Sequence, residues 1–293
     1  MYLLVGASGF LGSYILKNIL EMTEEDVLAA DVMCVGENKG RLKWQKCDVT
    51  KEQDVLALNE ITKKADDLKV IYLPVFFNVN KNPANDKIAW NVNITSYARF
   101  VDVMENVKVF YSMSTDMMYR IDNDCPYKET DPITPMNNYA LHKAVEERMA
   151  IAKGYNIIRS PVMMGASLSP SKKHFFDDIV SNLRSGQKME FFTDSWRSMI
   201  DFDTVAKTII ALINTPEAQQ YPIVNVAGDE SLSKYDFALR LADKYNLDKS
   251  LIVPISMDND DKIWKEKRPK KILLDNTLCK KILGIKELKL NIS

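Results

Sequence analysis

Tyr139 and Lys143 are a candidate pair for proton-transfer chemistry. They stand at positions i and i+4 of one helical face, and Pro132, Pro135 and Asn137 ahead of them are typical of a helix start. A free tyrosine, with a pKa of about 10, is a poor proton shuttle near neutrality. A lysine cation nearby and the positive nicotinamide of an oxidised cofactor favour the phenolate, so we expect a pKa closer to the working pH.

Hydroxyl side chains end an apolar strand ahead of this pair. The segment from Val107 closes on Ser112 to Asp116, and Thr115 stands 24 residues before Tyr139. In parallel sheets, ligands bind at the carboxyl ends of the strands. A hydroxyl at that place can hydrogen-bond a substrate carbonyl while Tyr139 protonates it. The alternative for Thr115 is a capped turn at a strand end.

Three regularly spaced glycines follow the first apolar strand. The segment Gly6-Ala7-Ser8-Gly9-Phe10-Leu11-Gly12 comes directly after Val5 and opens an amphipathic helix. Such glycines allow a tight turn, so that the helix N-terminus presents free N–H groups to a pyrophosphate. A plain glycine-rich turn is the alternative, because the spacing is GxxGxxG and not GxGxxG. The order of strand, glycines and helix predicts a dinucleotide site contacted by Gly6, Ser8, Gly9, Phe10, Leu11 and Gly12.

Two aspartates after the next strands are candidates for the adenosine end of the cofactor. Asp31 ends the second strand, where a carboxylate accepts hydrogen bonds from the ribose and repels a 2′-phosphate. This position favours NAD(H) over NADP(H), unless Lys39 or Arg41 folds back toward it. Asp48, after the third strand, either faces the adenine or serves as an ordinary turn residue.

The elements that must position these residues alternate between strands and helices. Apolar runs predict strands at 2–5, 27–30, 42–46, 70–73, 107–111 and 155–158, and helical patterns follow Gly9 and cover 85–106, 172–185, 203–213 and 234–245. This alternation indicates a Rossmann-type α/β fold, a doubly wound parallel sheet with helices on both faces. We expect residues 1–160 to form the dinucleotide-binding domain, with later segments returning to it, and residues 161–293 to form mainly a smaller C-terminal substrate-binding lobe.

The composition limits the classes of partner. The 293 residues carry 39 Lys and Arg against 40 Asp and Glu without a basic face, which argues against nucleic acid. The first residues lack a charged leader and no apolar run is long enough to span a bilayer, so we expect a cytoplasmic protein without membrane contact. Four dispersed cysteines and two histidines show no spacing typical of a disulfide framework or a metal site.

Several of these segments together resemble the extended short-chain dehydrogenase/reductase family, which includes nucleotide-sugar epimerases, dehydratases and reductases. The similarity covers nearly the whole chain, and its motifs are the glycine segment, Ser114-Thr115-Asp116, Asn138-Tyr139 with Lys143, and Arg268-Pro269. The runs 114–119 and 129–135 are similar to those of dTDP-4-dehydrorhamnose reductases. The resemblance implies Thr115, Tyr139 and Lys143 as catalytic residues, with Tyr139 and Lys143 also holding the cofactor.

The resemblance also implies contacts beyond the catalytic residues. It suggests a relay or substrate contact at Asn91, which otherwise is a local helix asparagine, and diphosphate contacts at Arg197 and Arg268, which otherwise form surface ion pairs. Backbone close to the cofactor follows the fourth strand, at Leu73. The 4,6-dehydratases carry a glutamate where this chain has Met117, so dehydration is not expected. For the assembly, a homodimer is the alternative to a monomer that the sequence leaves open.

One segment departs from the family pattern. Residues 73–77, Leu-Pro-Val-Phe-Phe, replace the small residues that the family commonly has beside the cofactor. The leading hypothesis is an NAD(P)-dependent reductase of a nucleotide-activated 4-keto sugar, with Tyr139 as the proton donor. Two alternatives stay open. One is a nucleotide-sugar epimerase without net redox change. The other is a non-catalytic dinucleotide-binding regulatory subunit, because the bulky Phe76 and Phe77 crowd the expected site.

Overall fold

Seven parallel strands form the central sheet. The computed structural model describes residues 1–77, 83–120, 122–169, 172–259 and 269–292. The strand order is β11-β6-β5-β4-β1-β2-β3, and every neighbouring pair is parallel. The bounds are Tyr2–Val5 (β1), Val27–Asp31 (β2), Leu42–Lys46 (β3), Leu68–Tyr72 (β4), Val107–Thr115 (β5), Asn156–Ser160 (β6) and Ile223–Asn225 (β11). This order is that of a Rossmann-type doubly wound sheet, so the predicted fold class is confirmed.

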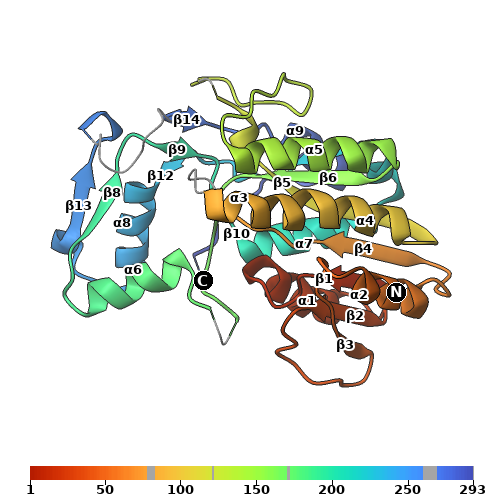
Figure 1. Cartoon of the computed structure of the whole chain (residues 1–293). Helices are drawn as coiled ribbons and strands as arrows, with labels where there is room; N and C mark the ends of the chain where they lie inside the picture. Colours follow the sequence, from red (N-terminus) through yellow and green to blue (C-terminus); the bar gives the residue numbers. More distant parts are fainter. Residues whose placement is uncertain (78–82, 121, 170–171, 260–268, 293) are drawn as a thin grey trace.

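Helices cover both faces of this sheet (Figure 1). On one face lie α1 (Phe10–Met22), α7 (Phe202–Ile213) and α9 (Thr277–Leu283), and on the other lie α2 (Glu52–Thr62), α4 (Ser96–Val103) and α5 (Asn138–Ala152). Alternate residues of β1 feed the two cores: Tyr2 and Leu4 pack into the first, Leu3 and Val5 into the second. Burial on both faces explains why this strand is a continuous apolar run in the sequence.

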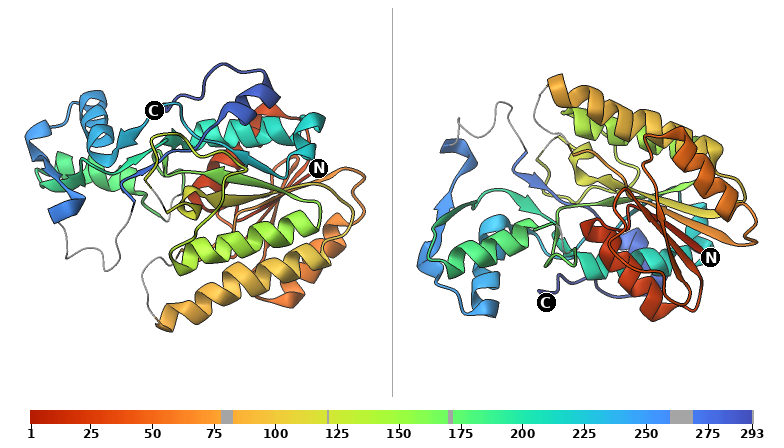
Figure 2. Two further views of the ribbon diagram at one scale, coloured as in Figure 1. Left: turned by 90° about the horizontal axis from the view of Figure 1, so that it is seen from above. Right: turned by 60° about the horizontal axis from the view of Figure 1, so that its bottom comes forward.

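A smaller lobe lies beside the sheet, as the views in Figure 2 also show. Its core includes Phe176 and Ile179 from α6 and Phe237 and Leu241 from α8. The bounds here are Phe175–Arg184 (α6), Lys234–Tyr245 (α8), Met189–Phe192 (β8), Ile252–Ile255 (β13), Trp196–Arg197 (β9), Leu232–Ser233 (β12) and Lys271–Ile272 (β14), while Met163–Met164 (β7) pairs with Ile200–Asp201 (β10). Short 3₁₀ turns are Asp116–Met118 (η2), Pro216–Gln220 (η3), Lys249–Leu251 (η4) and Met257–Asn259 (η5).

The segment 85–106, predicted as one long helix, has three parts in the structure. An α-helix, α3 (Pro83–Trp90), and α4 flank a π-helical turn, η1 (Asn91–Thr95), in which the Ser96 N–H donates to the Asn91 carbonyl. The predicted helical stretch is therefore present, with a π turn inside it. A π turn adds one residue to a helical turn, and this local change in hydrogen bonding leaves no periodic signal in the sequence.

The seventh strand comes from the second half of the chain. Strands β1 to β6 lie within residues 1–160, the range predicted for the dinucleotide-binding domain, and β11 joins them from residues 223–225. Within the described part of the chain, no helix combines the length and the apolar character that a bilayer span requires.

Candidate active site

The backbone of the glycine turn after β1 leaves no room for side chains at its glycines. Gly6 has φ +88°, and a Cβ built on Gly12 would lie 2.1 Å from the Gly6 carbonyl oxygen. Helix α1 then begins at Phe10, and its N-cap residue Gly9 makes no side-chain capping hydrogen bond. The first N–H groups of α1 thus point out of the turn without a capping side chain, which is the arrangement that binds phosphate.

The Asp31 carboxylate closes the turn from β2. It accepts hydrogen bonds from the Ser8 N–H at 2.9 Å and from the Met33 N–H at 3.3 Å. The Arg41 guanidinium, which could have folded back toward it, donates instead to the Leu20 and Glu25 carbonyls. Arg41 is therefore committed elsewhere, and the carboxylate stays beside the predicted phosphate turn.

Two further predicted cofactor contacts follow the third and fourth strands of the chain. Asp48 accepts hydrogen bonds from the Thr50 N–H at 3.0 Å and the Thr50 hydroxyl at 2.7 Å, and these bonds lower the pKa of its carboxyl. Leu73 donates its N–H to the Val5 carbonyl, and its Cβ lies 3.1 Å from the point where a Gly6 side chain would begin. Leu73 thus packs against the glycine turn, whereas Asp48 serves at least as a turn residue.

Thr115 and Tyr139, far apart in the sequence, meet at the carboxyl edge of the sheet. Thr115 ends β5 and is buried, and Tyr139 lies in the first turn of α5, which Asn137 caps by accepting the Ala140 N–H at 2.9 Å. The Thr115 hydroxyl lies close enough to the Tyr139 phenol to lower the pKa of that phenol. A substrate carbonyl at this point would face a hydroxyl and a phenol together.

Lys143 is buried next to a carboxylate that the sequence analysis did not single out. Its ammonium donates to Glu146 Oε2 at 2.8 Å, and both residues are less than 5% exposed. Burial raises the pKa of the Glu146 carboxyl to about 7, although Lys143 opposes the rise. The spacing from Tyr139 to Glu146, two helical turns along one face, was the available signal.

The electrostatics of Tyr139 differ from the expectation that Lys143 brings its pKa down. In the structure the pKa of the phenol is raised, mainly by burial and further by the Glu146 and Asp116 carboxylates, while the Thr115 hydroxyl lowers it. The expectation counted the positive nicotinamide as well as the lysine, so it stays a prediction for the site with cofactor bound. It did not count the Glu146 carboxylate that is paired with Lys143.

The bulky segment after β4 lies against this pair. The Phe77 ring meets the Tyr139 ring edge-on, with 4.8 Å between the centroids. Asn93 fixes the preceding residue: its side-chain oxygen accepts the Phe76 N–H at 2.8 Å, and its amide donates to the Phe76 carbonyl at 3.0 Å. The departure from the family pattern thus forms one wall of the site.

Asn93, and not Asn91, points into the protein from the π turn. Asn91, the predicted contact, is exposed, and its carbonyl accepts the Ser96 hydroxyl. Asn93 is 1% exposed and lies 3.3 Å from the ring nitrogen of His142. The sequence offered the motif Asn91-Val92-Asn93 but no means of choosing between its two amides.

Of the two arginines predicted to contact a diphosphate, one belongs to the part of the chain that the structure describes. Arg197 lies 3.5 Å from Asp116 and donates to the carbonyls of Trp196, Pro269 and Lys270. It is therefore already held by protein groups, next to the end of β5. Arg268 lies outside the described residues.

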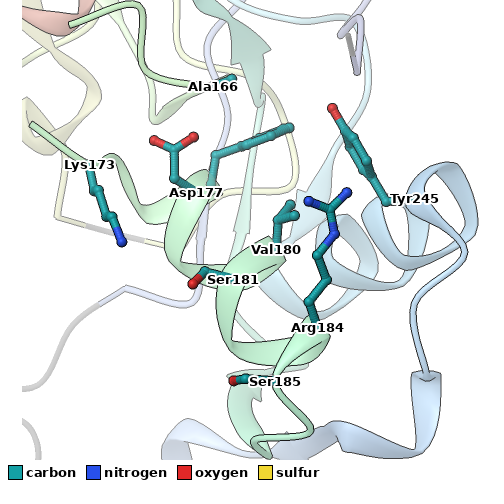
Figure 3. A pocket seen from close by; sticks show the side chains of 9 residues that line it. Ala166, Lys173, Asp177, Val180, Ser181, Arg184, Ser185 and Tyr245 are labelled. Carbon is teal, nitrogen blue, oxygen red and sulfur yellow. The ribbon is translucent and has the colours of Figure 1, made fainter. Parts of the chain in front are cut away.

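A surface pocket of about 590 Å³ runs along α6 in the smaller lobe (Figure 3). Asp177, Ser181 and Arg184 line it from α6, Lys173 lines it from the segment before this helix, and Tyr245 closes it from α8. None of the three predicted catalytic residues lines this pocket. The pocket is separate from the place where Thr115 and Tyr139 meet.

The sheet order, the glycine turn and the meeting of Thr115 with Tyr139 are those of the short-chain dehydrogenase/reductase class. The family model described as RmlD substrate binding domain matches residues 1–291, and the chain belongs to this family.

Known proteins similar to the chain over most of its length have different activities. The dTDP-4-dehydrorhamnose reductase of Aggregatibacter actinomycetemcomitans is 23% identical, over 97% of this chain and 93% of that protein. Methionine adenosyltransferase 2 subunit beta of Xenopus tropicalis is 23% identical, over 96% of this chain and 81% of that protein. The UDP-glucose 4-epimerase of Lactobacillus helveticus is 24% identical over 69% of this chain, and this and two other such epimerases are matched over 64%, 48% and 44% of their own length.

Solved structures agree on the fold. A dTDP-4-dehydrorhamnose reductase from Bacillus anthracis in complex with NADP has a TM-score of 0.79 at 17% identity, with 98% of this chain and 94% of that chain covered. A hypothetical dTDP-4-dehydrorhamnose reductase from Sulfolobus tokodaii has a TM-score of 0.78 at 25% identity, with 99% and 97% covered.

Proposed function

We propose that this protein is an NAD(P)-dependent reductase of a nucleotide-activated 4-keto sugar. The observation that carries the proposal is that the buried Thr115 hydroxyl, at the end of β5, and the Tyr139 phenol, at the start of α5, come together at the carboxyl edge of the sheet. That edge is where parallel α/β sheets bind ligands, and the glycine turn opens at the same edge. Family membership and the full-length similarity to a dTDP-4-dehydrorhamnose reductase support the same substrate class.

The residues of the turn fit a dinucleotide. A pyrophosphate needs a backbone without side chains and free helix N–H groups, and Gly6, Gly12 and the start of α1 provide both. Asp31 beside the turn and the commitment of Arg41 elsewhere support NAD(H) over NADP(H). Lys46 lies opposite Asp31 in the register between β2 and β3. Its cation would favour a 2′-phosphate and so would work against this preference.

The protein groups would act on the substrate carbonyl. When bound, the reduced nicotinamide supplies a hydride to the C4 carbon. Thr115 holds the carbonyl oxygen, and Tyr139 gives its phenolic proton to that oxygen, so the ketone becomes an alcohol and the phenolate regains a proton from solvent. The phenol enters the reaction protonated, because its pKa lies above neutrality in the structure.

The proposal is tested by reduced-cofactor consumption. Purified protein is offered NADH and NADPH separately with a freshly generated dTDP-4-keto-6-deoxy sugar, and oxidation is followed by absorbance. We expect consumption, faster with NADH, and a loss of about 10²- to 10⁴-fold in kcat in the Tyr139→Phe variant. Cofactor binding without consumption for this and related sugars would contradict a reductase, and interconversion of C4 isomers without consumption would identify an epimerase.

A second candidate is a regulatory subunit that binds dinucleotide without turnover. Two observations favour it: Phe77 packs on the Tyr139 ring, and the chain is similar over most of its length to a methionine adenosyltransferase subunit beta. The Phe77→Ala variant separates the two candidates. A reductase whose site is partly covered should show a changed KM for the sugar, whereas a regulatory subunit should show no turnover in either form.

A further inference from the structure

His142 stands between Tyr139 and Lys143 on α5 but has no part in the mechanism given above. Its side chain is buried, at 5% exposed. The ring meets the Trp90 ring of α3 edge-on, with 5.7 Å between the centroids. Its Nδ1 lies 3.3 Å from Nδ2 of Asn93 in the π turn. A buried ring nitrogen requires a hydrogen-bond partner, and Asn93 is in the position to be that partner.

The other hydrogen bonds of Asn93 decide what its amide offers to His142. The side-chain oxygen accepts the Phe76 N–H at 2.8 Å, and Nδ2 donates to the Phe76 carbonyl at 3.0 Å. A backbone N–H only donates and a carbonyl only accepts, so the amide cannot be turned the other way round. The group of Asn93 that faces His142 is therefore an N–H donor. His142 can accept it only as a neutral ring, with its proton on Nε2.

We infer that His142 is a positioning residue whose neutral ring holds the Asn93 amide on the Phe76 backbone. The next residue, Phe77, is thereby kept edge-on against the Tyr139 ring, with 4.8 Å between the centroids. A protonated ring carries N–H groups on both nitrogens, so two donors would face each other and the grip of Asn93 would loosen. The inference rests on the proposed function for its purpose, which is to shape the wall of the site, but its test needs neither cofactor nor substrate.

The surroundings of His142 favour the neutral ring at neutral pH. Burial lowers the pKa of His142 from its ordinary value of 6.5, and the Lys143 cation on the same helix lowers it further. The Asp86 carboxylate of α3 acts in the opposite direction, but it also accepts the Asn138 amide at 3.2 Å. The cation of His142 therefore forms only as the solution becomes acidic.

The test is hydrogen exchange at the Phe76 amide, the N–H that Asn93 accepts. The full chain is labelled with ¹⁵N-phenylalanine, the Phe76 signal is assigned by its loss in Phe76→Leu, and its exchange is followed by NMR. Each rate is divided by that of an unprotected amide at the same pH. We expect the protection of this amide to fall by about tenfold between about pH 7 and about pH 5, as His142 takes up its proton.

Two variants separate the acceptor from the ring. In His142→Asn the side-chain oxygen lies the same number of bonds from the backbone as Nδ1 and does not titrate, so protection should be retained at both pH values. His142→Phe keeps a ring against Trp90 without an acceptor, so protection should be low at both. His174→Asn is the matched control, because the second histidine of the chain caps α6 in the smaller lobe, and it should behave as the native chain does.

The outcomes distinguish this role of His142 from plain packing. Native protection in His142→Phe would overturn the inference, because a ring without an acceptor would then be sufficient. Loss of protection in acid by His142→Asn, to the same extent as in the native chain, would also overturn it, because another group would then be titrating. If His142→Phe does not fold, the native chain and His142→Asn still decide between the two.

Discussion

Glu146 and Glu147, neighbours on α5, each form a buried ion pair. The two pairs differ in the number of hydrogen bonds and in the elements they join. Glu147 receives two hydrogen bonds from the Arg159 guanidinium, at 2.9 and 2.7 Å, and the same guanidinium also donates to the Tyr119 phenol and the Glu129 carbonyl. Glu146 receives one hydrogen bond from Lys143, and its second oxygen has no hydrogen-bond partner among the described residues. All four charged residues are less than 5% exposed.

The difference in hydrogen bonding indicates a different role for each ion pair. The Glu147 pair joins α5 to β6, and its planar fork geometry uses every carboxylate oxygen, as expected of a pair that holds two elements together. The Glu146 pair stays within one helix and beside the phenol of Tyr139. A lysine held by a single bond keeps further N–H donors for another acceptor, such as a cofactor hydroxyl.

Removing the arginine should have the largest effect on stability. Arg159→Met leaves Glu147 buried without its cation, and we expect a loss of about 3–5 kcal/mol in the free energy of unfolding. Urea unfolding at neutral pH measures the loss. The double variant Arg159→Met with Glu147→Gln should recover part of it, and a double variant no better than the single one would contradict the pairing argument.

Removing Glu146 should change how stability depends on pH. The folded pKa of this carboxyl, about 7, exceeds the ordinary value of 4.5, so its contribution is full below about pH 4.5 and is lost as the pH rises through about 7. The native chain should therefore lose on the order of 3 kcal/mol across this window relative to Glu146→Gln. Urea unfolding at both ends of the window gives the difference, in which other titrating groups cancel. Parallel pH profiles would contradict the raised pKa.

Removing the lysine should cost the least stability. In Lys143→Met the Glu146 carboxyl loses the cation that opposes the rise of its pKa, so it stays neutral at neutral pH and we expect a loss of only about 1–2 kcal/mol. The dissociation constant for NADH, measured by protein fluorescence, should nevertheless rise, because Lys143 is a predicted cofactor contact. A loss as large as that of Arg159→Met would erase the contrast between the two pairs.

The sequence predicted the sheet well because its signal is local. The runs at 2–5 and 42–46 match β1 and β3 at both ends, and the glycine turn follows β1 as expected. These features depend on apolar runs and on glycines whose backbone no other residue can adopt.

The site was predictable only in part. Thr115 and Tyr139 were expected together from the order of strands and helices, and the structure brings the two side chains close to each other. The π turn that turns Asn93 inward and the carboxylate beside Lys143 depend on packing between α4, α5 and the sheet, which no short pattern records. The position of Arg197 against Asp116 likewise depends on how the smaller lobe meets the end of β5.

The central claim is that hydride passes from the nicotinamide to a sugar carbonyl at the Thr115–Tyr139 edge. The most direct measurement uses NADH deuterated at C4 on the transferred face, each face being tried in turn, and locates the label in the sugar product by mass spectrometry. The account predicts one deuterium at C4 of the alcohol product, from one of the two faces only, and none with Tyr139→Phe at matched times. A C4-epimerised sugar without label, or no product while NADH binds, would contradict it.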